Sequence, residues 1–292
     1  MDIQYICEFV TLAETCNYLE AADHLYISQS SLSRHIKALE DELGVSLFDR
    51  STRRVSLSSF GALFLPYAQR ITATRYEYES ALNNALNAEH GNVRIGSIPV
   101  MVQYQITDLI SRFRKEHPSF TIDIIEGDSL VLVKQLRSGQ CDLAFLREEG
   151  PADDEFNKLH YATDTLCAIM SRRHPFARRD FIYIRDLRNE PLMLLGKDTF
   201  MYSLCMRACA DAGFTPNVVL TNHRASNLLD LVRKEVGIAL LTRKPILPML
   251  SDDLTAIEVE PRIITNINIA YPKDKPLSSG ARHFINMAGA TL

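Results

Sequence analysis

The stretch SQSSLSRHIKALEDELGVSLFDR, residues 28–50, decides how the amino-terminal part of the chain folds. Its apolar residues recur at helical spacing and make one face that a small domain can bury: Leu32, Ile36, Leu39 and Leu43. Ser28 is a favourable residue for the start of such a helix, and Gly44 for its end. The opposite face has no acid before Glu40 and carries side chains that can bond base edges and phosphates: Gln29, Ser30, Ser33, Arg34 and Lys37. The stretch therefore predicts a helix suited to contacting DNA.

Two shorter helical patterns precede this stretch. Apolar positions within residues 3–13 predict one helix, and Asn17 followed by Glu20 resembles a capping box that opens another. A tight turn at residues 26–27 then leads into Ser28. Two helices joined by such a turn form a helix-turn-helix.

Residues 45–58 have the pattern of two short strands joined by a polar tip. β-Branched residues flank the polar segment 51–54, which predicts a two-stranded wing that carries Arg53 and Arg54 toward the phosphates of a duplex. Residues 1–58 contain five Lys and Arg against nine Asp and Glu, so the segment is not basic overall. Its five basic residues lie between positions 34 and 54. We therefore expect DNA contact through local clustering of charge rather than through net charge.

The composition limits the class of protein. With 292 residues and 46% hydrophobic content, the chain is long enough for two or three globular domains. It contains no run of about 18 apolar residues and no signal-peptide pattern, so we expect no membrane association and a cytoplasmic location. The six cysteines are scattered without paired C-x2-C spacing, which argues against structural zinc and favours reduced thiols.

Residues 59–90 have the pattern of one long helix. Its apolar positions form a single stripe that needs a partner surface, and Pro66 falls near its start, where it bends the helix without ending it. The polar break at residues 89–92 marks a domain boundary. We therefore expect a dimerisation helix between a DNA-binding domain, residues 1–58, and a separate domain that begins at residue 91.

The remainder of the chain alternates strand and helix patterns. The first strands are expected at residues 93–98, 121–126 and 142–146, with helices between them, which is the order of a parallel sheet. A second set of elements runs from residue 166 to residue 241, and residues 267–271 would return the chain to the first set. We predict two α/β lobes with a cleft: lobe I at about residues 91–163 and 267–292, and lobe II at about residues 164–266.

The amino-terminal residues closely resemble the winged helix-turn-helix signature of LysR-type transcriptional regulators. The resemblance is carried by Ala21, Ala22, Ser28, Gln29, Ser30, Leu32, Ser33, Arg34, Ile36, Leu39, Glu40, Leu43, Gly44, Leu47, Phe48, Arg50, Arg54, Val55 and Gly61. Further along, residues 59–90 are similar to the linker helix of that family, residues 93–96 to the start of its effector domain, and residues 236–241 to the strand that enters its hinge. The resemblance implies an α/β protein with an amino-terminal winged helix-turn-helix, a long linker helix and a two-lobed effector domain like that of periplasmic binding proteins.

The family also implies a function and an assembly. Its members are DNA-binding regulators that form a homotetramer, a dimer of dimers, on an interrupted palindromic operator, and the DNA bend changes when a small effector occupies the cleft. By this resemblance Gln29, Ser30, Ser33 and Arg34 face the major groove, and Arg53 or Arg54 meets the backbone or the minor groove. The chemistry agrees, because Gln29 can bond adenine through two hydrogen bonds and Arg34 can bond guanine or phosphate.

Effectors of such two-lobed domains are sought at the carboxyl ends of strands and the starts of the following helices. The candidates there are Ser97, Pro99, Met101, Asp128, Ser129, Arg147, Thr199 and Phe200. Arg147 beside two hydroxyls at helix starts suits a small carboxylate that also bears a hydroxyl or amino group.

Alternatives to this ligand stay open. An uncharged aromatic or apolar ligand could be lined by Met101 and Phe200. Arg147 could instead pair at the surface with Glu148 and Glu149. The two serines, Ser97 and Ser129, could serve only as helix caps.

Other functions have less support in the residues. No G-x-G-x-x-G, P-loop, G-x-S-x-G or H-E-x-x-H motif is present and the histidines are dispersed, so we expect neither an enzyme nor a cofactor or metal site. A redox-responsive regulator of the same fold could use Cys205 and Cys209, four residues apart on a predicted helix. This spacing seldom forms a disulfide, and Phe200 stands where the resemblance would place the reactive cysteine of peroxide-sensing members. We therefore interpret both thiols as structural.

Overall fold

The structure is a computed structural model, and it describes residues 2–49, 55–86, 91–149, 155–273 and 275–290. The chain divides into two compact units. One comprises Met1–Leu86 and Arg137–Gln140, and the other comprises Asn87–Leu136 and Cys141–Leu292. Among the described residues, no helix combines the length and the apolar character needed to cross a bilayer.

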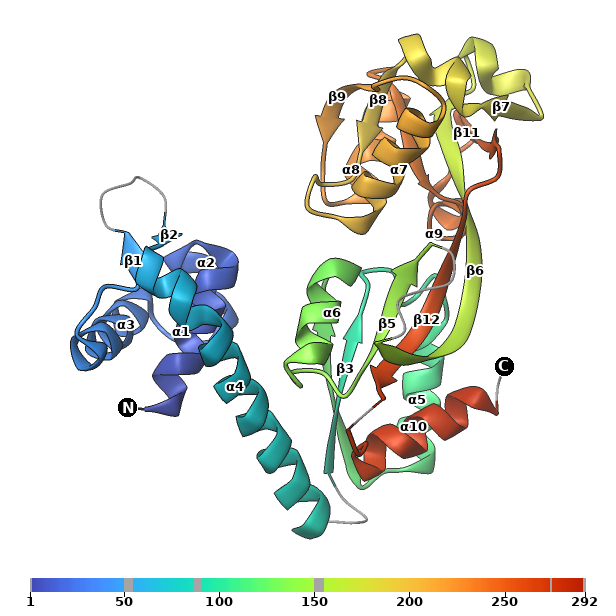
Figure 1. Cartoon of the computed structure of the whole chain (residues 1–292). Helices are drawn as coiled ribbons and strands as arrows, with labels where there is room; N and C mark the ends of the chain where they lie inside the picture. Colours follow the sequence, from blue (N-terminus) through green and yellow to red (C-terminus); the bar gives the residue numbers. More distant parts are fainter. Residues whose placement is uncertain (1, 50–54, 87–90, 150–154, 274, 291–292) are drawn as a thin grey trace. The chain divides into compact units, whose positions relative to one another are not determined.

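The first unit begins with three helices (Figure 1). They are α1 (Ile3–Thr15), α2 (Tyr18–His24) and α3 (Gln29–Leu43). The side chains of Asp2, Asn17 and Ser28 accept amide hydrogen bonds at the three helix starts, and α3 ends at Gly44, whose φ of 72° is left-handed. Both ends of α3 therefore lie where the sequence predicts them. Its apolar face packs against α1 and α2 in one buried cluster.

The wing is tied to α3 by a buried carboxylate. Its strands, β1 (Phe48–Asp49) and β2 (Ser56–Leu57), pair antiparallel as predicted. Glu40, on α3, is only 6% exposed and accepts hydrogen bonds from the backbone amides of Leu47, at 2.7 Å, and Phe48, at 3.2 Å. These bonds satisfy two backbone amides at the start of the wing and hold it against α3.

The long helix α4 (Ser59–Leu86) follows the wing and contains Pro66. Its first turn packs closely on the wing, because a Cβ atom added at Gly61 would lie 2.0 Å from the carbonyl oxygen of Leu47. Only glycine permits this approach of two backbones.

The second unit contains a ten-stranded sheet with the strand order β4-β3-β5-β12-β6-β10-β8-β9, in which β11 pairs with β6 and β7. Lobe I holds β3 (Gly91–Ser97), β4 (Phe120–Glu126) and β5 (Leu143–Glu148), with α5 (Ile106–Glu116), α6 (Ser129–Arg137) and α10 (Ser279–Gly289). β3 pairs parallel with both β4 and β5, as the sequence predicts. The core of this lobe surrounds Phe113, Phe145 and Phe284.

Lobe II contains its own set of parallel strands. It holds β7 (Phe181–Tyr183), β8 (Pro191–Leu194), β9 (Asn217–Thr221), β10 (Ile238–Thr242), β11 (Leu254–Glu260), α7 (Phe200–Asp211), α8 (Ala225–Arg233) and α9 (Arg243–Ile246). β8 pairs parallel with β9 and β10. One buried cluster lies under α7 and another under α8.

Two long strands connect the lobes (Figure 1). They are β6 (Phe156–Ser171) and β12 (Ile264–Pro272), and they pair antiparallel with each other. The first part of β6 lies beside β12, whereas its second part pairs antiparallel with β10 and β11. The predicted parallel arrangement is therefore confirmed for β3, β4 and β5. The antiparallel pairing of β6 and β12 was not predicted, and it needs no helical crossover because the paired strands run in opposite directions.

Candidate functional site

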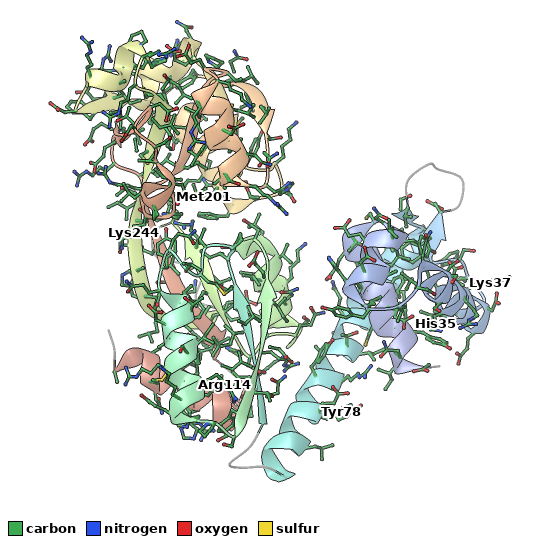
Figure 2. The ribbon with its side chains drawn as sticks, turned by 180° about the vertical axis from the view of Figure 1, so that it is seen from behind. His35, Lys37, Tyr78, Arg114, Met201 and Lys244 are labelled. Carbon is green, nitrogen blue, oxygen red and sulfur yellow. The ribbon has the colours of Figure 1, made fainter. Side chains whose placement is uncertain are left out.

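The exposed face of α3 carries all five residues predicted to contact DNA from that helix. Gln29, Ser30, Ser33, Arg34 and Lys37 are exposed. Figure 2 labels Lys37 on this helix, together with its neighbour His35. The predicted wing contacts, Arg53 and Arg54, lie outside the described residues. The described part of the site is thus one helix face with donors and hydroxyls, backed by a buried apolar face.

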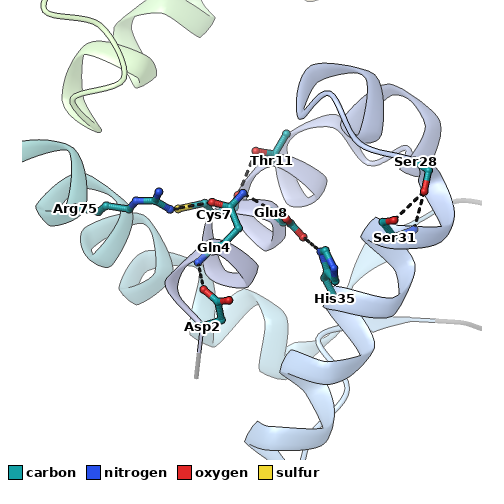
Figure 3. Close-up of polar contacts among 9 residues, drawn as sticks. All are labelled: Asp2, Gln4, Cys7, Glu8, Thr11, Ser28, Ser31, His35 and Arg75. Atoms are coloured by element: carbon teal, nitrogen blue, oxygen red, sulfur yellow. Dashed lines mark hydrogen bonds and ion pairs between the residues drawn. The ribbon is translucent and has the colours of Figure 1, made fainter. Parts of the chain in front are cut away.

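A hydrogen bond between a buried carboxylate and a histidine, which the sequence reasoning missed, holds α3 against α1 (Figure 3). Glu8 on α1 is 1% exposed, and its Oε2 atom lies 2.8 Å from Nδ1 of His35 on α3. The ring of Tyr5 stacks on the imidazole with 4.5 Å between centroids. The sequence signal for this pair was a carboxyl group at a core position of an amphipathic helix, because a buried polar group needs a hydrogen-bond partner. The pair fixes the helix next to Arg34 and Lys37.

The same carboxylate is connected to the long helix. Gln4 donates from Nε2 to Oε1 of Glu8 at 3.3 Å, and its own amide oxygen accepts from Nη1 of Arg75 on α4 at 3.0 Å (Figure 3). Arg75 also donates to Glu79 at 2.8 Å, and this bond is the main cause that raises the pKa of Arg75. Polar contacts therefore run without interruption from α4 through α1 to α3.

Large apolar side chains remain exposed along α4. They are Phe60, Leu63, Tyr67, Tyr78 and Leu82. Figure 2 labels Tyr78 on the far half of the helix. Two positions of the stripe predicted from the sequence, Tyr78 and Leu82, are uncovered in a single chain, and Leu82 is 56% exposed. Two others, Ala68 and Ile71, pack instead into the core of the first unit.

A cavity of about 220 Å³ lies between the lobes of the second unit. Six of the eight predicted effector residues line it: Pro99, Asp128, Ser129, Arg147, Thr199 and Phe200. The other two do not. Ser97 is fully buried and donates its hydroxyl to the carbonyl of Ile98, at 3.2 Å, and Met101 packs against the core of lobe I. The sequence reasoning missed other lining residues, which include Glu126, His223, Thr242 and Ile246.

The guanidinium of Arg147 is held inside the protein. It is 4% exposed and donates to the hydroxyls of Thr265 and Tyr104, both at 2.8 Å. Tyr104 in turn donates to Asp164, and burial is the main cause that raises the pKa of this phenol. Arg147 therefore forms no surface pair with the acidic residues that follow it: Glu148 pairs with Lys158 at 2.6 Å, and Glu149 pairs with Arg207 at 2.7 Å.

Two of the predicted residues meet across the cavity. Both carboxylate oxygens of Asp128, from lobe I, lie 3.1 Å from the backbone nitrogen of Phe200, the first residue of α7 in lobe II. Ser129 also has a defined role, because its hydroxyl accepts from the backbone amide of Arg147 at 2.8 Å. Thr199 accepts from the amide of Tyr202 and so caps α7.

The two cysteines considered for a redox role lie in the core of lobe II. Cys205 and Cys209 are buried on α7, and no disulfide joins them. Burial raises the pKa of the Cys205 thiol, and it raises the pKa of Cys209 to about 11. Both groups are therefore protonated at neutral pH, which lowers their reactivity with peroxide.

Known proteins resemble the whole chain. A family model described as a bacterial regulatory helix-turn-helix protein of the lysR family matches residues 5–62, and a model described as a LysR substrate binding domain matches residues 87–292. YwbI of Bacillus subtilis, an uncharacterized HTH-type transcriptional regulator, is 28% identical over 287 residues, which cover 98% of this chain and 95% of that protein.

Two further comparisons agree with this result. The HTH-type transcriptional regulator ShiR of Corynebacterium glutamicum is 31% identical over 247 residues, which cover 83% of this chain and 83% of that protein. The crystal structure of HinK, a LysR family transcriptional regulator from Pseudomonas aeruginosa, is also similar, with a TM-score of 0.60 and 27% sequence identity. The match covers 100% of this chain and 98% of the HinK chain. The chain belongs to the LysR family of DNA-binding transcriptional regulators that carry an effector-binding domain.

Proposed function

We propose that the chain regulates transcription, without enzymatic activity, by contacting operator DNA through α3 and by responding to a small molecule in the cavity between its lobes. The division proposed is a DNA-binding domain of residues 1–58, a linker helix of residues 59–90 and an effector domain of residues 91–292. The observation that carries the proposal is the exposed face of α3, which has no acid among its first eleven residues and is held rigidly by caps, core and the Glu8–His35 pair. A rigid helix loses little conformational entropy when it enters a major groove.

The residues proposed to contact DNA have different tasks. Gln29 and Arg34 have the geometry for two hydrogen bonds to one base edge, to adenine and guanine respectively. Ser30, Ser33 and Lys37 add contacts to bases or phosphates, and Arg53 and Arg54 are proposed to neutralise phosphates from the wing. The operator is proposed to be an interrupted palindrome, because a twofold dimer presents two copies of α3.

Replacing Arg34 by alanine tests this assignment. We expect Arg34→Ala to weaken binding to a selected operator by about 10- to 100-fold at physiological salt and to relax the preference for one base pair. The operator is first selected from a random duplex pool with the unaltered protein, and affinities are then measured by fluorescence anisotropy. Arg112→Ala removes an exposed arginine of lobe I that pairs with Glu116, and it should leave DNA affinity unchanged. Equal affinity of Arg34→Ala and the unaltered protein would remove Arg34 from the interface.

The exposed stripe on α4 supports a proposed dimer through this helix, with tetramers formed by contacts between effector domains. Burying Leu82 and its apolar neighbours against a second copy removes their surface from water. We expect Leu82→Asp to shift the protein to monomer at micromolar concentration, as measured by light scattering. Val102→Asp changes another exposed apolar residue, in lobe I, and serves as the matched control. A monomer before any substitution would contradict the proposal.

The effector is proposed to occupy the cavity that Pro99, Asp128, Arg147 and Phe200 line. The sequence offered two ligand classes, a small carboxylate and an uncharged ligand. Binding of a carboxylate ligand was predicted from the guanidinium of Arg147. In the structure this guanidinium already donates to the hydroxyls of Tyr104 and Thr265. Much of the remaining lining is apolar, with Ile98, Val100, Leu195, Met201 and Ile246. The cavity therefore gives more support to the second class.

A further inference from the structure

Asp128 connects helices from opposite lobes. Its carboxylate accepts from the amide of Leu130, in the first turn of α6, at 3.0 Å, and from the amide of Phe200, at the start of α7, at 3.1 Å. α6 belongs to lobe I and α7 to lobe II. One side chain thus supplies negative charge to two helix starts at once and holds the lobes together across the cavity.

The amino end of α7 is consequently occupied by groups of the protein itself. The first amides of a helix attract anions, because they point outward and the helix dipole is positive there. In α7 the amide of Phe200 is bonded to Asp128, and the amide of Tyr202 is bonded to the hydroxyl of Thr199 at 3.1 Å. A ligand carboxylate arriving here would have to displace a carboxylate that is tethered in place.

The charges around Asp128 also disfavour an anion. Glu126 lines the same cavity, and the positive charge of Arg147 is balanced by the carboxylate of Asp164, to which it is connected through the hydroxyl of Tyr104. His223 lies 2.8 Å from Asp198, an acid outside the cavity lining. Burial, with a smaller contribution from the charge of Asp198, raises the pKa of Asp128, which means that the site already resists one negative charge.

We propose that Asp128 selects the effector: the cavity binds a compact, mainly apolar molecule that offers a protonated amine or a hydroxyl to this carboxylate, and it rejects carboxylates. The proposal rests on the proposed function, in which this cavity is the effector site. A donor group satisfies the acceptor capacity that Asp128 retains beyond its amide bonds. The cavity volume of about 220 Å³ suits a single small ring.

Three probes of one shape test the charge preference. Cyclohexylmethylamine, cyclohexylmethanol and cyclohexanecarboxylate share one ring and differ in the charge of the group attached to it. Titration calorimetry with the full chain at neutral pH should show that the amine binds at least about 10-fold more tightly than the carboxylate, with the alcohol between them. Asp128→Asn keeps an oxygen that can accept from Phe200 but removes the charge, so it should abolish this ranking by weakening the amine and strengthening the carboxylate.

The matched control is Asp198→Asn. It removes a neighbouring acid that does not line the cavity, and it should preserve the ranking of the three probes. A second measurement needs no ligand: hydrogen exchange of the Phe200 amide should accelerate at least about 10-fold in Asp128→Ala and remain slow in Asp128→Asn.

Specific results would overturn the proposal. One such result is that the carboxylate binds the unaltered protein as tightly as the amine does. Another is that Asp128→Asn weakens the binding of all three probes equally, because that would indicate a loss of packing. Failure of all three probes to bind at millimolar concentration would also overturn the assigned ligand class. Operator binding, measured in parallel, separates these outcomes from failure of the proposed function, which would require that DNA binding be absent as well.

Discussion

Glu40→Ala is expected to lower the free energy of unfolding of the first unit by about 2–4 kcal/mol and to abolish operator binding at 37 °C. The carboxylate of Glu40 is the acceptor for the amides of Leu47 and Phe48 in a buried setting. Alanine leaves both donors without this partner, and the wing loses its attachment to α3. Urea unfolding followed by far-ultraviolet circular dichroism measures the change, as a shift of the transition in which the helices of the first unit melt.

Glu40→Gln is the control for this prediction. Glutamine keeps one acceptor oxygen at the same distance from the backbone, so its loss of stability should be smaller than that of alanine. Equal transitions for Glu40→Ala and the unaltered protein would mean that water replaces the carboxylate without loss.

The second large effect is expected at Gly61. Gly61→Ala would place a Cβ atom 2.0 Å from the carbonyl oxygen of Leu47 and 2.9 Å from Cδ2 of Leu57. The first of these contacts is with backbone, which cannot rotate away, so α4 must shift from the wing. We expect a cost of about 3 kcal/mol or more, seen as a lower melting temperature and a loss of affinity for the operator.

Gly289→Ala provides a matched comparison. The nearest atom to its added Cβ would be 3.8 Å away, which is an ordinary contact, and the residue is likewise helical. This variant should melt within about 1 °C of the unaltered protein, because surface substitutions of this kind change stability little. Full stability and full DNA affinity of Gly61→Ala would show that the long helix can move away from the wing at no cost.

The first unit was predictable because its signals are local. Ser28 and Gly44 mark both ends of α3, and the period of its apolar residues identifies its buried face. Glu40 and Glu8 were harder to interpret, since a carboxylate on a helix is usually solvated. Their partners are backbone amides and a histidine 27 residues away, and such contacts appear only when the chain has folded.

The second unit was less predictable because distant pairing decides it. The first half of β6 contains Asn157, Lys158 and His160 and has no strong strand signal, yet it pairs with β12 more than 100 residues later. The cavity residues at strand ends were found by the rule that ligands bind there. Ser97 was misplaced because alternate side chains of a strand point to opposite faces, and a sequence pattern does not say which face is the open one.

The pairing of the two strands that connect the lobes limits how the lobes can move. β6 and β12 stay hydrogen-bonded to each other where they pass between the lobes, and their register shifts at Ile267 and Asn268, where a bulge bends the ladder. Sliding of one lobe over the other would break that ladder, whereas rotation about it leaves the bonds intact. We therefore expect a ligand in the cavity to move the lobes mainly by rotation about this ladder, so that its binding changes the angle between them.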